Sequence, residues 1–151
     1  HLAFRVFRAT IWLVSVVVAF QPVAFEYLVP FEWLLIVPLQ WSGAGFLLVG
    51  FALAVGANFS LGKQWRSGIV NHHDHALIEQ GLYSISRNPG YIGVAIAQVG
   101  FFMALPSLFS LVCLLVGLAA LRKQTHLEED FLNARYQDRY LAYQQLVPRW
   151  L

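Results

Sequence analysis

Three long apolar stretches, separated by polar segments, set the pattern of this chain. They cover residues 7–28, 33–57 and 91–121. A helix needs about 20 apolar residues to cross the hydrocarbon core of a bilayer, so each stretch can form at least one membrane helix. Pro22 is expected to kink or end the first helix, because proline removes a backbone donor. The second stretch contains small residues that let membrane helices approach closely: Gly43, Gly45, Gly50 and Gly56.

The third stretch is too long for one straight crossing. Pro106 and Ser107 lie in its middle and predict a helical hairpin. Its first arm, residues 91–105, is short enough to be tilted or re-entrant, and its second arm can extend past Leu121. Further residues recur at helical spacing and predict that this helix leaves the membrane and ends before Pro148: Leu127, Phe131, Leu132, Tyr136, Tyr140 and Tyr143. We therefore predict an all-α, polytopic integral membrane protein with about four membrane segments and a cytoplasmic C-terminal helical region.

Composition supports this class. The chain is 58% hydrophobic and 12% charged, whereas soluble domains are about 45–50% apolar and about 25% charged. This difference favours a membrane protein over a soluble helical protein with an unusually large core. Arg5 and Arg8 before an apolar run are also typical of signal peptides, but apolar character that continues through Leu28 favours a true span.

The distribution of basic residues predicts an orientation. With four crossings, every Lys and Arg falls on one side of the membrane: Arg5, Arg8, Lys63, Arg66, Arg87, Arg122, Lys123, Arg135, Arg139 and Arg149. By the positive-inside rule, both termini and residues 58–89 are cytoplasmic. The net charge of +2 is too small to indicate nucleic-acid binding. The single Cys113 excludes an internal disulfide, and the sequence does not specify an oligomeric state.

A polar segment, residues 81–93, precedes the third apolar stretch and contains Arg87-Asn88-Pro89-Gly90-Tyr91. One interpretation is a loop with a membrane-flanking arginine and a proline at a helix start, where proline is favoured. The other is an anion or cofactor site. Arg87 could bind a carboxylate with two parallel hydrogen bonds, and a helix start offers unpaired N–H groups. The residue types leave both interpretations open.

Two further polar clusters can also be interpreted either as ordinary surface or as a binding site. Glu128 and Glu129 are adjacent acids, which usually lie on a solvated surface, but they could also bind hydroxyls or a positively charged group of a ligand. The cluster at residues 72–75, His-His-Asp-His, has the side chains that bind transition metals. Adjacent loop residues rarely all face one ion, so no metal site is predicted there.

Taken in order, the motifs resemble those of the isoprenylcysteine carboxyl methyltransferase family and the related phospholipid N-methyltransferases. They are Leu61-Gly62 with Trp65, His75-Ala76-Leu77-Ile78, Gly81-Leu82-Tyr83, Arg87 through Gly93, Glu128-Glu129, Tyr140 through Tyr143, and Val147-Pro148-Arg149. The resemblance covers Leu61 to Leu151. It implies one domain, residues 1–151, in which residues 1–60 form transmembrane helices and residues 61–151 form a cofactor-binding catalytic core.

The resemblance implies a membrane enzyme that uses S-adenosylmethionine. The implied cofactor-binding residues are His75, Ala76, Leu77, Ile78, Tyr83, Asn88, Pro89, Gly90, Tyr91 and Glu128, with Glu129 as the alternative acid. Arg87, Asn88 and Glu128 are the expected catalytic residues, and Arg122 and Gln124 the expected substrate-binding residues. Asn88 stands where the family has a histidine, and Gln124 stands where the carboxyl methyltransferases have an arginine.

Three functions remain open at this level. The first is methylation of a lipophilic, membrane-embedded acid such as an isoprenylcysteine. The second is methylation of a phospholipid amine or a small thiol, and the third is a non-catalytic or reductase-like relative. An amine or thiol must lose a proton, and no residue identifies itself as the base, which favours a carboxylate or an already ionised nucleophile. The expected partners are a lipophilic or lipidated substrate and membrane lipids, without nucleic acid.

Overall fold

A computed structural model describes residues 2–61 and 77–151, with side chains described from residue 11 onward. The described chain is helical and contains no β-strand. Its long elements are α1 (Leu2–Phe20), α2 (Val37–Leu61), α3 (Pro89–Ala104), α4 (Leu108–Tyr136) and α5 (Asp138–Leu146). Short 3₁₀ helices lie between them: η1 (Pro22–Leu28), η2 (Glu32–Leu34) and η4 (Gly81–Ser84).

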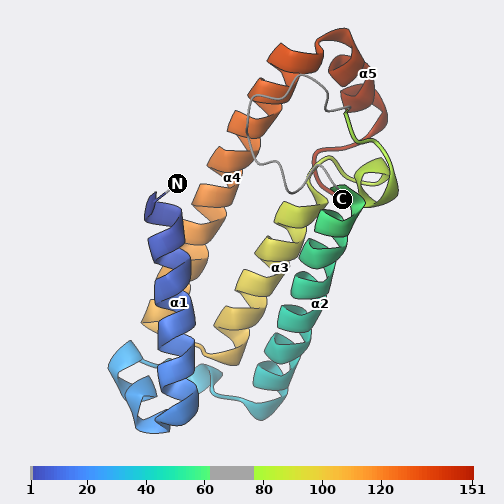
Figure 1. Cartoon of the computed structure of the whole chain (residues 1–151). Helices are drawn as coiled ribbons and strands as arrows, with labels where there is room; N and C mark the ends of the chain where they lie inside the picture. Colours follow the sequence, from blue (N-terminus) through green and yellow to red (C-terminus); the bar gives the residue numbers. More distant parts are fainter. Residues whose placement is uncertain (1, 62–76) are drawn as a thin grey trace.

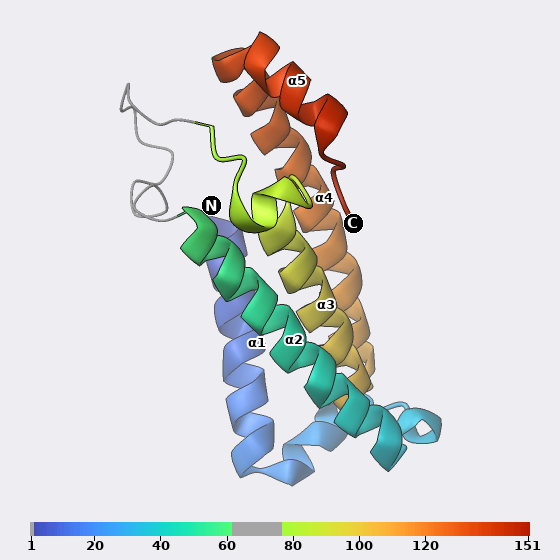
Figure 2. The same cartoon turned by 90° about the vertical axis from the view of Figure 1, so that its right-hand side faces the viewer.

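The four longest helices run alternately up and down in one bundle (Figures 1 and 2). The α1–α2 and α3–α4 connections lie at one end of the bundle. Pro30 and Ser107 form an isolated bridge that joins these two connections. The opposite end carries the C-terminal end of α2, the segment that precedes α3, and α5 (Figures 1 and 2). We call this the polar end, because the predicted motifs gather there.

Two helices, α2 and α4, are long and apolar enough to cross a membrane. In their most apolar windows only 11% and 28% of residues are buried inside the protein, respectively. Their apolar surfaces therefore face outward, as in a membrane helix and unlike the core helix of a soluble protein. Among the described side chains, residues 11–20 of α1 form an apolar segment, and α3 is apolar over its 16 residues. The predicted all-helical class is confirmed, with two membrane-capable helices.

Two of the predicted helix breaks occur at prolines. Helix α1 ends at Phe20, just before Pro22, and Pro106 lies between α3 and α4. Ser107 then starts α4 with a reciprocal capping box in which its side chain and that of Ser110 each accept a backbone N–H. One expectation was wrong. The helix predicted to leave the membrane and end before Pro148 is broken at Gln137, whose φ of 45° separates α4 from α5.

Helices α2 and α3 pack with their backbones in contact. Gly43 lies against Gly100, and Gly50 lies against Gly93. A Cβ atom built on any of the four would overlap backbone of the facing helix. Because the glycines repeat every seven residues on both antiparallel helices, the contact continues over two turns. This contact fixes α2 against α3 near the N-terminus of α3.

We expect Gly50→Leu to destabilise the protein by about 3 kcal/mol, the upper end of the range for overpacking, because rigid backbone blocks the new side chain. Gly45 is the matched control, since a Cβ there meets nothing within 4 Å. Gly45→Ala should leave stability unchanged or raise it slightly through helix propensity. Thermal unfolding of the detergent-solubilised variants measures both effects, and equal melting temperatures would contradict the packing argument.

Candidate functional site

The segment before α3 is held against α5 by a small hydrophobic cluster and one strong hydrogen bond. Leu77 packs with Tyr140, Tyr143 and Val147. The hydroxyl of Tyr143 donates to the carbonyl of Tyr83 at 2.6 Å. Gly81 opens η4 at a φ of 64°, which favours glycine. These contacts fix the turn that carries Tyr83.

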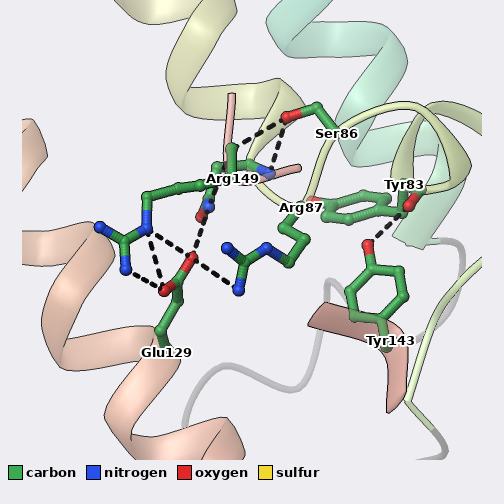
Figure 3. Close-up of polar contacts among 7 residues, drawn as sticks. Tyr83, Ser86, Arg87, Glu129, Tyr143 and Arg149 are labelled. Carbon is green, nitrogen blue, oxygen red and sulfur yellow. Dashed lines mark hydrogen bonds and ion pairs between the residues drawn. The ribbon is translucent and has the colours of Figure 1, made fainter. Parts of the chain in front are cut away.

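Glu129 is the centre of a buried charge cluster (Figure 3). Its side chain is 4% exposed. Arg149 donates from Nη2 to Oε2 at 2.8 Å, and from Nε to both carboxylate oxygens at 3.1 and 3.2 Å. Arg87 approaches from the other side, with Nη1 3.6 Å from Oε1. One carboxylate therefore faces two guanidinium groups, which leaves the cluster with a net positive charge.

Pro148 and Arg149 also bind the loop that precedes α3. The N–H of Arg87 donates to the carbonyl of Pro148 at 2.9 Å. The carbonyl of Arg149 accepts from Ser86 Oγ at 3.1 Å and from Asn88 Nδ2 at 3.3 Å. Asn88 Nδ2 also donates to Glu129 Oε1 at 3.1 Å. Residues 86–88, 129, 148 and 149 thus form one hydrogen-bonded unit, although they are far apart in the sequence.

Beside this unit lies a cavity of about 230 Å³, which we call the polar cavity. At its mouth the hydroxyl of Tyr91 donates to Glu128 Oε2 at 2.7 Å. Glu128 is exposed, in contrast to its neighbour Glu129. The residues that line the polar cavity are Ala54, Asn58, Leu61, Tyr83, Arg87, Asn88, Gly90, Tyr91, Val94 and Glu128.

The polar cavity has a positive side and a negative side. Arg87 lines it, and its Nε and Nη1 atoms are buried with no hydrogen-bond partner. Asn88 occupies the N-cap position of α3, but its side chain makes no capping bond. The N–H groups in the first turn of any helix have no partner within it. Because no side chain caps them here, those that follow Pro89 remain donors. With Glu128 on the other side, the cavity suits a ligand that carries both an anionic and a cationic or hydroxyl group.

The phenol of Tyr83 is held in its neutral form. Burial raises the pKa of Tyr83 from 10.0 to about 12, and the negative charge of Glu128 adds to the shift. The hydroxyl is therefore a hydrogen-bond donor at neutral pH and cannot serve as a general base.

We expect the tyrosinate absorbance of Tyr83, obtained as the difference between wild type and Tyr83→Phe, to titrate near pH 12. Between about pH 10 and 12 the folded protein holds this proton and the unfolded chain has lost it. Tyr83 should therefore lower stability as the pH rises through that window. A titration midpoint near 10 would contradict the burial of this phenol.

The described chain brings together six of the predicted site residues in the polar cavity: Tyr83, Arg87, Asn88, Gly90, Tyr91 and Glu128. Glu129 lies in the neighbouring charge cluster, and Leu77 in the hydrophobic cluster. Ile78, Pro89, Arg122 and Gln124 do not line the cavity, although Gln124 lies one turn before Glu128 on α4. His75, Ala76 and the histidine cluster lie outside the described residues.

Sequence reasoning missed several residues of this site. Asn58 and Leu61 at the end of α2, together with Ala54 and Val94, line the polar cavity. An asparagine near the end of an apolar helix is a usable signal, whereas the apolar residues gave none. Arg149 was noted as part of a motif but not as the partner of Glu129.

Helices with outward-facing apolar surfaces, and a polar cavity at one end, indicate a helical membrane protein with a candidate ligand site. A sequence profile of the phospholipid methyltransferase family matches residues 39–139. The chain belongs to this family, and the resemblance predicted from its motifs is confirmed.

A curated relative gives the same result. The chain is similar to protein-S-isoprenylcysteine O-methyltransferase of Schizosaccharomyces pombe, with 30% identity over 112 residues. The aligned region covers 72% of this chain and 48% of the yeast protein, so the chain spans about half the length of that relative. No solved structure gives a significant match.

Proposed function

We propose that this protein transfers a methyl group from S-adenosylmethionine to a lipophilic, membrane-embedded acceptor. The observation that carries the proposal is the polar cavity at the start of α3, where Arg87 and Glu128 offer opposite charges. Family membership supports methyl transfer as the reaction. When bound, S-adenosylmethionine supplies an electrophilic methyl group on a sulfonium.

The residues of the polar cavity fit a ligand of that kind. Arg87 and the first-turn N–H groups of α3 would bind a carboxylate. Tyr83 and Tyr91 would offer aromatic faces to a positive charge, and Glu128 would bind hydroxyl or amino groups. The volume of 230 Å³ is below the roughly 300–1,000 Å³ of pockets that enclose drug-sized ligands. These residues would therefore enclose one portion of the cofactor.

Carboxyl O-methylation of an isoprenylcysteine-like acid is the reaction that we favour. A carboxylate could accept the methyl group that a bound sulfonium would supply without first losing a proton. An amine or thiol acceptor must also release a proton to a base. Tyr83 cannot accept it, because the phenol is protonated at neutral pH and its pKa is raised to about 12. Among the described lining residues this leaves the Glu128 carboxylate, which we have already assigned to the cofactor. The yeast relative is named for O-methylation of an isoprenylcysteine.

Methylation of a phospholipid amine is the second candidate, because the matching family is that of the phospholipid methyltransferases. A small thiol remains a further acceptor class. A non-catalytic or reductase-like role would require that this protein bind no S-adenosylmethionine analogue.

Purified protein in detergent, given methyl-tritiated S-adenosylmethionine and either an S-farnesylcysteine derivative or phosphatidylethanolamine, tests these alternatives. A methyl ester releases tritiated methanol in base, whereas an N-methyl group is retained. We expect base-labile label on the isoprenylcysteine. Base-stable label on the phospholipid would select the second candidate, and no label together with no binding of S-adenosylhomocysteine would overturn the proposal.

We also propose four membrane crossings, with the polar end in the cytoplasm. The connections at residues 21–36 and 105–107 carry no Lys or Arg, whereas Arg87, Arg139 and Arg149 belong to the polar end. In a Cys113→Ser background, Val23→Cys should react with a membrane-impermeant maleimide from outside intact cells. Ser84→Cys should react only after permeabilisation. Labelling of both positions from the same side would overturn this topology.

A further inference from the structure

A second cavity, of about 570 Å³, lies between α1 and the other three long helices. Its wall is formed mainly by apolar side chains, among them Val16, Leu47 and Phe101. Trp12 of α1 and Phe51 of α2 line it and are also exposed on the outside of the bundle, so hydrocarbon can enter between α1 and α2 from the bilayer. We call this space the apolar cavity. Its size is within the roughly 300–1,000 Å³ of pockets that enclose a whole small ligand.

The near end of the apolar cavity meets the polar cavity. Ala54 of α2 and Val94 of α3 line both cavities. Tyr91, one turn before Val94 on α3, belongs to the polar cavity alone. A molecule with a polar reacting group and a hydrocarbon chain can therefore place the group beside Tyr91 and the chain beyond Val94, without crossing a gap. A bilayer acyl chain has no polar group that would use the second cavity.

The far end of the apolar cavity is blind. Ala104 and Leu105 line it there, at the end of α3. Pro106 and Ser107 follow directly, and neither lines the cavity, because both are fully buried in the connection to α4. The N–H of Phe31 donates to the carbonyl of Pro106 at 2.9 Å, which ties this connection to the one between α1 and α2 (Figure 1). The cavity therefore stops at the level of Ala104 instead of continuing along the bundle.

The distance between the two ends sets a chain length. Ala104 follows Val94 by ten residues on α3, which corresponds to about 15 Å along the helix axis. An extended hydrocarbon chain advances about 1.25 Å per carbon, for a carbon–carbon bond of about 1.5 Å, so about 12 carbons span this distance. The main chain of a farnesyl group has this length. A geranyl group is four carbons shorter, and a geranylgeranyl group is four carbons longer.

We propose that the apolar cavity holds the hydrocarbon chain of the methyl acceptor, and that its blind end at Ala104 and Leu105 makes the protein selective for chain length. The farnesyl group fills the cavity to its end, a geranyl group leaves the end empty, and the fourth isoprene unit of a geranylgeranyl group finds no space there. That the ligand is a methyl acceptor rests on the proposed function. The inference adds the position of its chain and the residues that limit the chain's length.

The test measures the affinities of N-acetyl-S-geranylcysteine and N-acetyl-S-farnesylcysteine for the full chain in detergent, by isothermal titration calorimetry. Ala104→Phe fills the blind end. It should weaken binding of the farnesyl probe by about 10- to 100-fold, as overpacking of a fitted space would, and leave binding of the geranyl probe unchanged. Each probe also enters the micelles, but these are the same for every variant, so the ratio of variant to wild-type affinity reports the cavity alone.

Ala52→Phe is the matched control. Ala52 is exposed on α2 and lines neither cavity, so its replacement should change the affinity of neither probe. Leu105→Trp, at the same level as Ala104, serves if Ala104→Phe fails to fold. Equal losses for both probes, or no loss for the farnesyl probe, would overturn the inference. Displacement of the farnesyl probe from wild type by an equal concentration of phosphatidylcholine would also overturn it, because a bilayer lipid would then be the occupant.

Binding of S-adenosylhomocysteine separates this inference from the proposed function. Ala104→Phe should leave that binding unchanged, because Ala104 does not line the polar cavity. If the farnesyl-selective loss is found in a protein that binds no S-adenosylhomocysteine, the chain-length selection stands and the proposed methyl transfer fails. If wild type places base-labile label on the isoprenylcysteine but Ala104→Phe shows no farnesyl-selective loss, methyl transfer stands and this inference fails.

Discussion

Replacement of Glu129 by glutamine is expected to lower the free energy of unfolding by about 3–5 kcal/mol, the range for removing one partner of a buried ion pair. Glu129 is 4% exposed and Arg87 is 11% exposed, so water cannot replace the lost charge. The Asn88 amide and Arg149 also lose a charged acceptor. The loop at the start of α3 should loosen together with the cluster.

The exposed pair of Glu79 and Arg139 is the matched control. Its side chains are 38% and 57% exposed, so Glu79→Gln should change stability by no more than about 1 kcal/mol. The double variant Glu129→Gln with Arg87→Met should be more stable than the sum of its single effects predicts, because it removes the unpaired charge as well. Thermal unfolding in detergent is measured for wild type, Glu129→Gln, Glu79→Gln, Arg87→Met and the double variant. Equal losses of stability in Glu129→Gln and Glu79→Gln would contradict the burial of the charge cluster around Glu129.

Glu128→Gln is expected to weaken binding of S-adenosylhomocysteine by about 10- to 100-fold while leaving thermal stability nearly unchanged. A hydrogen bond to a charged group contributes about 1.5–3 kcal/mol, which corresponds to this range. Glu128 is exposed and accepts a hydrogen bond from Tyr91 at Oε2, so we expect folding to depend little on its charge. Isothermal titration calorimetry measures the affinity.

Asp130 is the control for this charge. It is an exposed acid two residues further along α4 and does not line the polar cavity. Asp130→Asn should bind S-adenosylhomocysteine as wild type does. Tyr91→Phe removes the hydroxyl that orients Glu128 and should weaken binding several-fold, as expected for one hydrogen bond. Unchanged affinity in both Glu128→Gln and Tyr91→Phe would remove these residues from the cofactor site.

The helices and their ends could be predicted where local chemistry decides them. Pro22 and Pro106 mark real breaks, because proline interrupts any helix regardless of its surroundings. The break at Gln137 could not be predicted, because a glutamine at a φ of 45° has no local signature. There the tertiary contacts of Tyr140 and Tyr143 with Leu77 override the helical spacing that runs through residues 127–143.

The site was predictable by residue type but not by role. Glu128 and Glu129 look equivalent in the sequence, yet adjacent helical positions point about 100° apart, so one reaches the polar cavity and the other faces Arg87 and Arg149. Only the packing of α4 against the start of α3 distinguishes them. The partner of Glu129 lies 20 residues away, beyond the turn at Gln137, and no local pattern connects the two.

The contact of residues 148 and 149 with the loop at residues 86–88 sets an order of assembly. Helices α2 and α3 precede Arg149 in the chain, so they are synthesised before that arginine exists. Until Arg149 is added, Glu129 lacks its closest counter-ion, and the carbonyls that receive Ser86 and the Arg87 N–H have not been made. A chain truncated before residue 148 would therefore keep its apolar helices but could not assemble the polar end.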